Sequence, residues 1–265
     1  PLATVSPVEL AGATVRKATL NNFGDILRKD VKIGSRVLIR RSNEVIPEIL
    51  GAYEHTGESV DIQKPLFCPY CGAELIEEGA NVFCPNKKCR PRVAAALANF
   101  ASKGGMDVEG FSEMTAYQLI DVLGVSNFSD LYALDKEKLS RLEGFGDKKI
   151  KNLLGALEKS KQASLDRFLF ALGIDGIGKV ASKDLAARFG SVEALSEATA
   201  EDLVALENIG EKTAANVVEY FSSPENREEI GRLFAAGVSP FVKKRAEGSR
   251  RPSGLRKTRF SSNSL

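Results

Sequence analysis

The sequence predicts a multidomain α+β protein with a small β-barrel, a four-cysteine zinc finger and an all-α domain of tandem helical hairpins. Three observations lead to this fold class. Short runs rich in Val, Ile and Leu fill the first 62 residues, the four cysteines lie within 22 residues, and a glycine motif recurs four times in a helical region. A chain of 265 residues is long enough for two or three domains.

The barrel is expected over residues 1–64. Partial alternation of apolar and polar residues predicts short strands, which Gly12, Gly34 and Asn43 separate. The expected strands span residues 4–10, 13–20, 36–41 and 44–50. A turn at Ser42-Asn43 joins the last two as a hairpin, and short strands at this spacing are typical of a small barrel.

All four cysteines fall in the loop-rich segment 65–92, as two knuckles of spacing C-x2-C and C-x4-C separated by twelve residues. Structural zinc binds four thiolates in a tetrahedron, and two short knuckles supply them without a large core. Two disulfides or unrelated free thiols are the alternatives, but we find no secretory signal, so reduced thiols are the default. We expect a structural Zn²⁺, because four protein ligands leave no open position for catalysis. The expected ligands are Cys68, Cys71, Cys84 and Cys89.

The region 93–242 carries Ala, Leu, Glu and Lys at helical spacing, and a five-residue motif recurs within it. Its pattern is apolar, acidic, Gly, apolar, Gly. The copies span residues 108–112, 142–146, 174–178 and 206–210. The offsets of 34, 32 and 32 residues indicate repeated supersecondary units. Ser112 replaces the second glycine of the first copy, and Asn208 replaces the first glycine of the fourth.

Each copy predicts a helix, a tight turn and a second helix. The first glycine permits a left-handed turn, which Asn208 also tolerates, and the second lets the backbone approach a ligand closely. The next helix then begins with free N–H groups and the positive end of its dipole, which favours a phosphate. This is the chemistry of a helix-hairpin-helix motif, which grips a nucleic-acid backbone without reading its sequence.

Glycines and lysines of the last three copies are the expected DNA-binding residues: Gly144, Gly146, Lys148, Lys149, Gly176, Gly178, Lys179, Lys183, Gly210 and Lys212. A purely structural turn is an equal alternative for the first and fourth copies, because each has lost one glycine.

The formal net charge of +2 conceals an uneven distribution. Residues 243–259 hold eight basic residues and one acidic residue, so the rest of the chain carries a net −5. We expect residues 243–265 to be a basic linker or tail, and other DNA contacts to be local. The single histidine, His55, excludes multi-histidine metal sites and lies in a polar stretch typical of the surface. No apolar run is long enough to cross a membrane.

The order of these modules resembles the C-terminal half of bacterial NAD-dependent DNA ligases. Residues 4–22 and 29–49 are similar to the barrel of that family, residues 68–89 to its zinc module, and residues 99–113 to the entry of its first hairpin. The resemblance covers residues 1–242 and implies an OB-type barrel, which we expect here to lack its first strand.

The resemblance also implies roles for three barrel residues. Arg41, Val45 and Ile46 match the family motif that meets the minor groove beside a nick. A solvated strand end for the arginine, and barrel core for the apolar pair, are the alternatives. Ser42-Asn43 departs from the family's usual Ala-Gly in this turn, and Asn21 departs from its usual His.

The family's chemistry is expected to lie in another domain. With NAD and Mg²⁺, that domain attaches AMP to the lysine of a K-x-D-G motif, transfers it to a 5′-phosphate and seals the nick. No lysine of this chain is followed by x-Asp-Gly. We therefore expect a fragment without catalytic residues that closes around nicked duplex DNA and does not ligate alone. Its implied partner is the adenylation domain of the same full-length chain, in a monomeric, nucleoid-associated protein of the bacterial cytoplasm.

Two other function classes stay open. A stand-alone, non-catalytic zinc and helix-hairpin-helix module of repair or recombination would use the same hairpins, but it would not need the barrel. An RNA-bound zinc protein fits less well, because residues 93–242 hold 16 basic and 23 acidic residues. Residues 253–265 loosely resemble the opening of the family's terminal BRCT domain, and an unstructured basic tail is the alternative.

Overall fold

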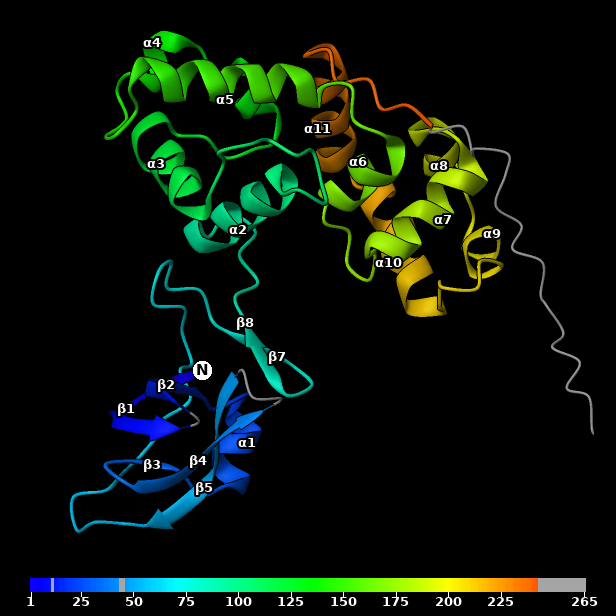
Figure 1. The fold of residues 1–265 in the computed structure, drawn as a ribbon. Helices are drawn as coiled ribbons and strands as arrows, with labels where there is room; N and C mark the ends of the chain where they lie inside the picture. Colours follow the sequence, from blue (N-terminus) through cyan, green and yellow to red (C-terminus); the bar gives the residue numbers. More distant parts are fainter. Residues whose placement is uncertain (11, 43–45, 243–265) are drawn as a thin grey trace, which may run out of the picture. The chain divides into compact units, whose positions relative to one another are not determined.

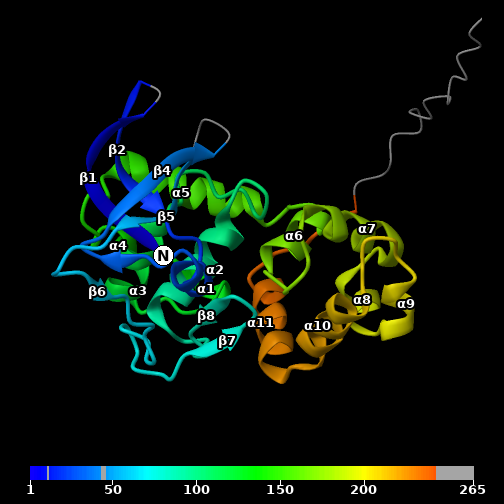
Figure 2. The same ribbon diagram turned by 90° about the horizontal axis from the view of Figure 1, so that it is seen from below.

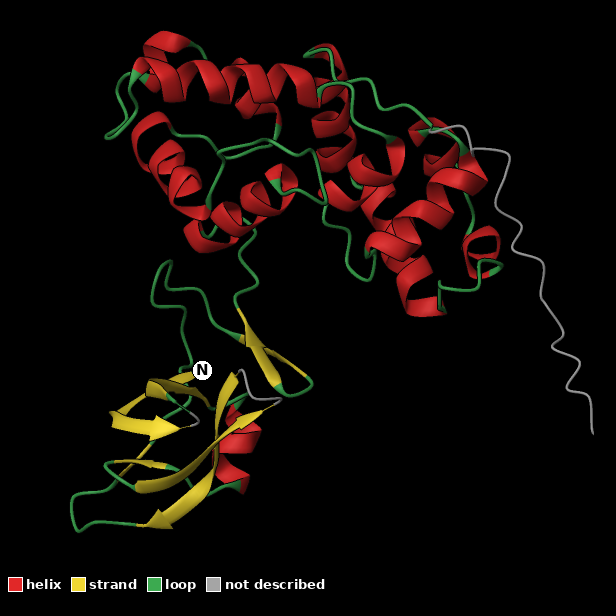
Figure 3. Cartoon of the chain, in the orientation of Figure 1, coloured by secondary structure: helices red, strands yellow, loops and turns green. Residues whose placement is uncertain are grey.

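The computed structural model of the protein describes residues 1–10, 12–42 and 46–242. The chain divides into two compact units, over residues 1–95 and 96–265 (Figure 1). Strands dominate the first unit, and the described part of the second consists of helices and the loops between them (Figure 3). The mixed α+β fold class predicted from the sequence is confirmed.

A curled four-stranded sheet opens the first unit, in the order β1-β2-β5-β4. Its strands are β1 (Leu2–Leu10), β2 (Ala13–Thr19), β4 (Arg36–Ser42) and β5 (Ile46–Glu54). Two antiparallel hairpins, β1-β2 and β4-β5, are joined by one parallel pairing between Thr19 and Glu48. Register shifts in both hairpins mark bulges, which increase the local twist and curl the sheet. The four predicted strands are confirmed, with small differences at their ends.

A short helix, α1 (Phe23–Arg28), packs on the core of this sheet. Asn22 caps the helix, because its side chain accepts a hydrogen bond from the Asp25 N–H at 2.8 Å. Ile26 is buried together with Ile49 of β5, so the helix closes one side of the barrel core. The sequence did not predict α1, since six residues are too few to show a helical period. β3 (Lys32–Ile33) and β6 (Val60–Asp61) pair separately.

The cysteine segment contains its own small hairpin, formed by β7 (Ile76–Glu78) and β8 (Asn81–Phe83). Helix α2 (Arg90–Ala101) begins directly after the last cysteine. Its Arg92 Nη1 donates to the Cys84 carbonyl at 2.7 Å, which fastens the first turn of the helix to the second knuckle.

After α2, one 3₁₀ helix and nine α-helices follow within the described residues. They are α3 (Glu113–Leu123), η1 (Ser129–Ala133), α4 (Lys136–Leu139), α5 (Asp147–Ser160), α6 (Leu165–Ala171), α7 (Lys179–Phe189), α8 (Val192–Ser196), α9 (Ala200–Val204), α10 (Glu211–Ser222) and α11 (Pro224–Ala235). The helices α4 and α5 pack together with η1, and α6 to α10 pack as a second group (Figure 2). None of the described helices is long and apolar enough to span a membrane.

Two connections join these helical groups. Helix α11 contacts both α10 and η1, and its buried Glu229 accepts hydrogen bonds from the Ser129 N–H at 2.8 Å and the Ser129 hydroxyl at 2.9 Å. The extended chain after α11 runs along the α5–α6 connection, where Phe241 exchanges backbone hydrogen bonds with Ala163 and Leu165. The last described segment therefore holds the two groups together.

Candidate nucleic-acid interface and metal centre

Each glycine motif forms the turn between two helices. Gly110, Gly144 and Gly176 have φ angles of +80°, +73° and +84°, so the first glycine of each of these copies adopts the predicted left-handed conformation. The apolar residue after the turn is buried in the last three copies, at Phe145, Ile177 and Ile209. These side chains anchor the turns in the helical core.

The fourth turn differs from the prediction. Among the described residues, only Asn21, Asp30 and Asp107 have positive φ without being glycine. The expectation that Asn208 takes the left-handed conformation is therefore wrong. Its amide Nδ2 instead donates to Asp184 Oδ2 on α7 at 2.7 Å, and this bond holds the fourth turn.

The helix starts that follow the turns are not equivalent. Gly146, Gly178 and Gly210 are the N-caps of α5, α7 and α10, and no side chain caps these helices. Their first-turn N–H groups are available to an anionic ligand. In the first copy, by contrast, the Ser112 hydroxyl accepts a hydrogen bond from the Thr115 N–H at 3.2 Å. This self-capped helix is the weakest candidate for phosphate binding.

The predicted lysines lie at the beginnings of these helices and are exposed. The structure places Lys148 and Lys149 in the first turn of α5, Lys179 and Lys183 in the first two turns of α7, and Lys212 in the first turn of α10. Every predicted cation of the hairpins thus accompanies an uncapped helix start.

Two local contacts shape the charge at the start of α5. Lys149 Nζ lies 3.7 Å from the centroid of the Phe145 ring, an attractive cation–π geometry. Asp147, the first residue of the helix, forms an ion pair with Lys136 at 2.8 Å, and this partner lowers the pKa of Asp147. Lys136 thus offsets the negative charge of Asp147, which would repel a phosphate at this position.

Reciprocal contacts dock the third and fourth hairpins onto each other. Asn216 Nδ2 on α10 donates to the Asp175 carbonyl in the third turn at 3.1 Å. In return, the Asn208 amide of the fourth turn reaches Asp184 on α7. The Asn216 bond joins the third turn to α10, which follows the fourth turn. The Asn208 bond joins the fourth turn to α7, which follows the third.

The first and second hairpins repeat half of this arrangement. Gln118 Nε2 on α3 donates to the Glu143 carbonyl in the second turn at 3.0 Å. Asn152 on α5 lines a groove together with Gly110 of the first turn. The three side chains that make these docking bonds from a helix, and Asn152, all occupy the sixth position after the motif's last residue: Gln118, Asn152, Asp184 and Asn216 follow residues 112, 146, 178 and 210.

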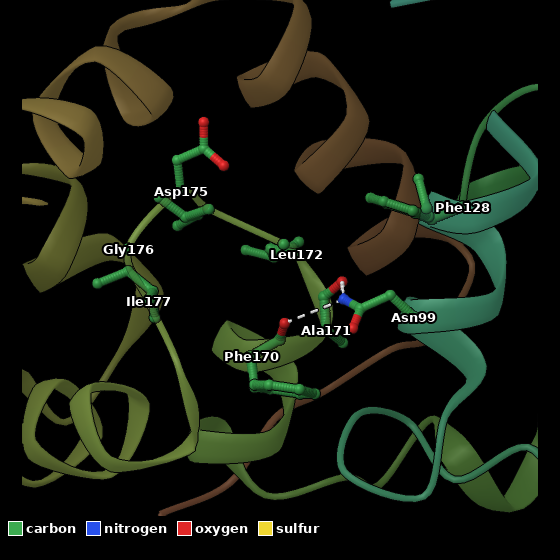
Figure 4. Close-up of a pocket in the computed structure, with 11 residues that line it drawn as sticks. Asn99, Phe128, Phe170, Ala171, Leu172, Asp175, Gly176 and Ile177 are labelled. Atoms are coloured by element: carbon green, nitrogen blue, oxygen red, sulfur yellow. Dashed lines mark hydrogen bonds between the residues drawn. The ribbon is translucent and has the colours of Figure 1, made fainter. Parts of the chain in front are cut away.

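Two hollows accompany the hairpins. A groove of about 540 Å³ lies between the first and second turns, with Gly146, Lys148 and Lys149 along it. A hollow of about 340 Å³ lies beside the third turn, where Asn99 of α2 points toward the segment 170–177 (Figure 4). The Asn99 amide reaches the carbonyls of Phe170 and Ala171, both at 3.4 Å, and so links α2 to the end of α6.

Two of the three barrel residues expected at the minor groove lie near the open end of the β4-β5 pair, Arg41 in β4 and Ile46 in β5. Ile46 is 59% exposed, which does not fit the alternative that it belongs to the barrel core. Arg41 is half-buried beside Pro47 of β5, and its Nε is buried without a hydrogen-bond partner among the described residues. Val45 lies outside the described residues.

The four cysteines meet although up to 21 positions separate them. Their sulfur atoms all lie within 4.8 Å of one another, with Cys68 Sγ 3.7 Å from Cys89 Sγ and Cys71 Sγ 3.5 Å from Cys84 Sγ. A backbone N–H at Ala73 lowers the pKa of Cys71 to about 6, whereas burial raises the pKa of Cys89 to about 12. This donor set and spacing are those of a metal site.

The single histidine is not a catalytic base. His55 Nε2 lies 2.8 Å from Asp30 Oδ2, and its Nδ1 lies 2.9 Å from Ser35 Oγ. The bond to His55 lowers the pKa of Asp30. Ser35 Oγ already accepts the Lys32 N–H at 3.2 Å, and the Asp30 side chain is 71% exposed, so these bonds fasten a barrel loop rather than activate a nucleophile.

Comparison with known protein families gives three matches. Residues 1–60 match the NAD-dependent DNA ligase OB-fold domain, residues 106–159 a SAM-like helix-hairpin-helix tandem, and residues 167–241 a helix-hairpin-helix motif. The two helical matches cover the two docked pairs of hairpins. The barrel match indicates the enzyme family that carries this combination.

Relatives extend the similarity over almost the whole chain. "DNA ligase 2" of Clostridium acetobutylicum is 46% identical over 243 residues, and "DNA ligase" of Alkaliphilus metalliredigens is 47% identical over 242 residues. Each alignment covers 91% of this chain. The chain belongs to the NAD-dependent DNA ligase family. It spans 36% and 37% of the length of these two ligases, so most of each has no counterpart here.

Three features of the site in this ligase family member were not predicted from the sequence. The side chains six positions after each motif were not identified, although all four are Asn, Gln or Asp, a pattern visible in the repeat itself. The self-capped Ser112 was not distinguished from the uncapped glycines. Nothing in the sequence indicated that the loop before the first hairpin reaches Lys179 of the third.

Proposed function

We propose that this chain is the DNA-clamping part of an NAD-dependent DNA ligase that seals nicks in duplex DNA during replication and repair. It closes around nicked duplex DNA and holds the 5′-phosphate and the 3′-hydroxyl in position. An adenylation domain elsewhere in the full-length protein supplies the nucleotide chemistry with NAD and Mg²⁺. The chain itself contributes no catalytic residue.

One observation carries the DNA-binding proposal: three helix starts at Gly146, Gly178 and Gly210 are uncapped, and each bears an exposed lysine in its first turn. N–H groups and a nearby ammonium bind a phosphate without reading the base. We assign backbone contacts to the second, third and fourth hairpins. The first hairpin is assigned a docking role, because Ser112 already caps its helix.

The barrel supplies a second contact with the duplex. The proposed elements are Arg41, Val45 and Ile46, and the exposure of Ile46 supports this role. An apolar side chain pressed on sugar edges widens the minor groove without sequence selectivity. The unpartnered Nε of Arg41 is an N–H donor that a DNA acceptor could satisfy.

The metal is proposed to be Zn²⁺ held by all four thiolates. A tetrahedral zinc site with Zn–S bonds of about 2.3 Å has sulfurs about 3.8 Å apart, close to the 3.7 Å between Cys68 and Cys89 and the 3.5 Å between Cys71 and Cys84. When bound, the ion cross-links the two knuckles and stabilises the finger, and it supplies no chemistry to the reaction. The four proposed modules are residues 1–64, 65–92, 93–242 and 243–265, of which the last lies outside the described residues.

We further propose that the protein works as a monomer in the bacterial cytoplasm, associated with the nucleoid. The pairing of hairpins within one chain supports a monomer, since the second, third and fourth turns already have docking partners in the same chain. Sedimentation of the chain with and without duplex DNA tests this assignment, and a second copy in the sedimenting complex would contradict it.

A gel shift with nicked and intact duplexes at two salt concentrations tests the DNA proposal. We expect binding to weaken steeply with salt and to favour the nicked duplex, because backbone contacts release counterions. Lys149→Glu should weaken binding to all sequences alike. Lys159→Glu is the matched control, since it makes the same charge change at the other end of α5. An equal effect of both variants would show that net charge, and not the hairpin, governs binding.

A further inference from the structure

Among the described residues, three hairpins have a second helix without a side-chain cap, and only in the third hairpin does that helix begin with a cationic residue. Its first helical residue is Lys179, and its first turn contains no acidic residue. In the second and fourth hairpins the same position holds Asp147 and Glu211. A cation at a helix N-terminus is repelled by the dipole, so Lys179 does not stabilise its own helix.

The side chain of Lys179 lies over a bare stretch of backbone. If Gly104 carried a Cβ, that atom would lie 2.6 Å from Lys179 Cε and 3.2 Å from Lys179 Nζ. It would also lie 3.1 Å from an edge atom of the Phe170 ring. The Lys179 ammonium is 5.7 Å from the centroid of that ring. The absence of a side chain at residue 104 therefore makes the room that Lys179 occupies.

One arginine holds this backbone in place. Arg167 on α6 donates from Nε to the Gly105 carbonyl at 2.8 Å and from Nη2 to the Lys103 carbonyl at 2.9 Å. The same Nη2 lies 3.1 Å from Asp107 Oδ2. Three contacts from one guanidinium fix the carbonyls on both sides of Gly104, so the surface under Lys179 cannot move freely.

The same loop also packs on the C-terminal end of α2. Gly105 is buried, and a Cβ there would meet the Phe100 carbonyl at 2.6 Å, so the backbone packs directly on the end of α2. The loop that contains Gly104 and Gly105 precedes the first hairpin in the sequence, but it packs against the third hairpin.

We propose that Gly104, held by Arg167 and flanked by Phe170, positions Lys179 to contact a DNA phosphate at the third hairpin. The inference rests on the proposed function and adds positioning residues to it. A free lysine loses side-chain entropy when it binds, whereas a lysine already confined between a ring and a backbone loses less. None of the three supporting residues needs to touch DNA.

The test is a double-mutant cycle with a nicked duplex as the probe. We expect Lys179→Gln to raise the Kd roughly three- to tenfold and to lower the salt slope by about one. Gly104→Ala should raise the Kd several-fold with little change in Tm, because its one contact below 3.0 Å is with the far end of the flexible Lys179 side chain. In the Lys179→Gln background, Gly104→Ala should have no further effect.

Two further variants keep the test decisive. Phe170→Leu removes the ring beside Lys179 and leaves residue 104 unchanged, so it should show the same coupling if Gly104→Ala folds poorly. Gly155→Ala is the control, because no atom lies within 4 Å of a Cβ at that exposed helical position. Additive losses from Gly104→Ala and Lys179→Gln, or no loss from Lys179→Gln alone, would overturn the positioning role. Absence of binding by the unmodified chain would overturn the proposed function instead.

Discussion

Glycines with a left-handed backbone carry the hairpins, and their neighbours decide how strictly glycine is needed. At Gly144 a Cβ would meet nothing within 4 Å, whereas at Gly176 it would lie 2.7 Å from Thr213 Oγ1 of the fourth hairpin. Both positions have positive φ. Gly144 is therefore needed only because its backbone is left-handed. Gly176 is needed for the same reason and also because Thr213 of the fourth hairpin leaves no room for a Cβ.

Substitution by alanine should separate these two needs. Gly144→Ala should cost about 1–2 kcal/mol of unfolding free energy, from the left-handed backbone alone. Gly176→Ala should cost about 1–3 kcal/mol more, because the new methyl group also displaces Thr213. Urea unfolding of both variants checks the difference. Equal losses of unfolding free energy would contradict a close contact between residue 176 and Thr213.

At the scale of elements, the cysteine segment, our proposed zinc finger, is the segment that we expect to depend most on a ligand. Its strands β7 and β8 have three residues each, and four cysteines form its centre. With little apolar surface to bury, such a segment relies on its metal for stability.

Removal of the metal should unfold the finger and spare the helical hairpins. A strong chelator is expected to abolish amide exchange protection in residues 65–92 while leaving α5 and α7 protected, as measured by hydrogen exchange with mass spectrometry. Cys71→Ser should act in the same way, and Cys84→Ser should match it if both thiols hold one ion. Unchanged protection in chelator would remove the structural role of the metal.

Helix α9 offers a test of pH dependence. Thr199 and Asp202 form a reciprocal cap at its start, and the hydrogen bonds from Thr199 lower the pKa of Asp202 from its usual 3.8. A carboxyl group with a depressed folded pKa stabilises the fold above its unfolded pKa, and the effect is lost as pH falls through the folded value. The Tm difference between the unmodified chain and Asp202→Asn should therefore be largest near neutral pH and vanish once the pH has fallen below the folded pKa of Asp202. A difference independent of pH would contradict this cap.

Much of the structure of individual strands, turns and helices was predictable, because it depends on residues close together in the sequence. The four barrel strands follow from alternation, and the positive φ angles of Gly110, Gly144 and Gly176 follow from the motif. Asn208 does not take the left-handed conformation that its residue type tolerates, and its side chain bonds to Asp184 of α7. Helix α1 was missed because its signal is one cap and one turn.

On the scale of the whole helical unit, Glu229 joins parts that are far apart in sequence. Only 8% of this residue is exposed, and its carboxylate receives both hydrogen bonds from Ser129 as well as Arg232 Nη2 at 2.7 Å. A buried carboxylate is tolerated because every contact compensates its charge.

Glu229→Gln should weaken this joint. We expect a loss of about 1–3 kcal/mol in unfolding free energy, since the amide cannot satisfy the same four donors, which also include Arg232 Nε at 3.0 Å. Glu228→Gln is the matched control: its carboxylate also pairs with Arg232 but is 71% exposed, so its loss should stay below about 1 kcal/mol. Chemical denaturation compares the two, and similar losses would show that the joint contributes little.

The complete chain should bind DNA without reacting with NAD. None of its lysines lies in a K-x-D-G motif, so incubation with NAD and Mg²⁺ should leave its mass unchanged. Mass spectrometry of the intact chain is the measurement. A covalent AMP adduct would mean that another lysine serves as the nucleophile.

The sequence by itself predicted the modules of this ligase family member and their ligand classes in broad terms, from four thiols at knuckle spacing and from glycine turns that expose helix starts. Those features depend on residues within a few positions of one another. Only the tertiary structure decided which hairpins dock, that Gly104 underlies Lys179, and that Ser129 meets Glu229 across 100 positions. Such contacts arise from packing between distant segments, and no local preference encodes them.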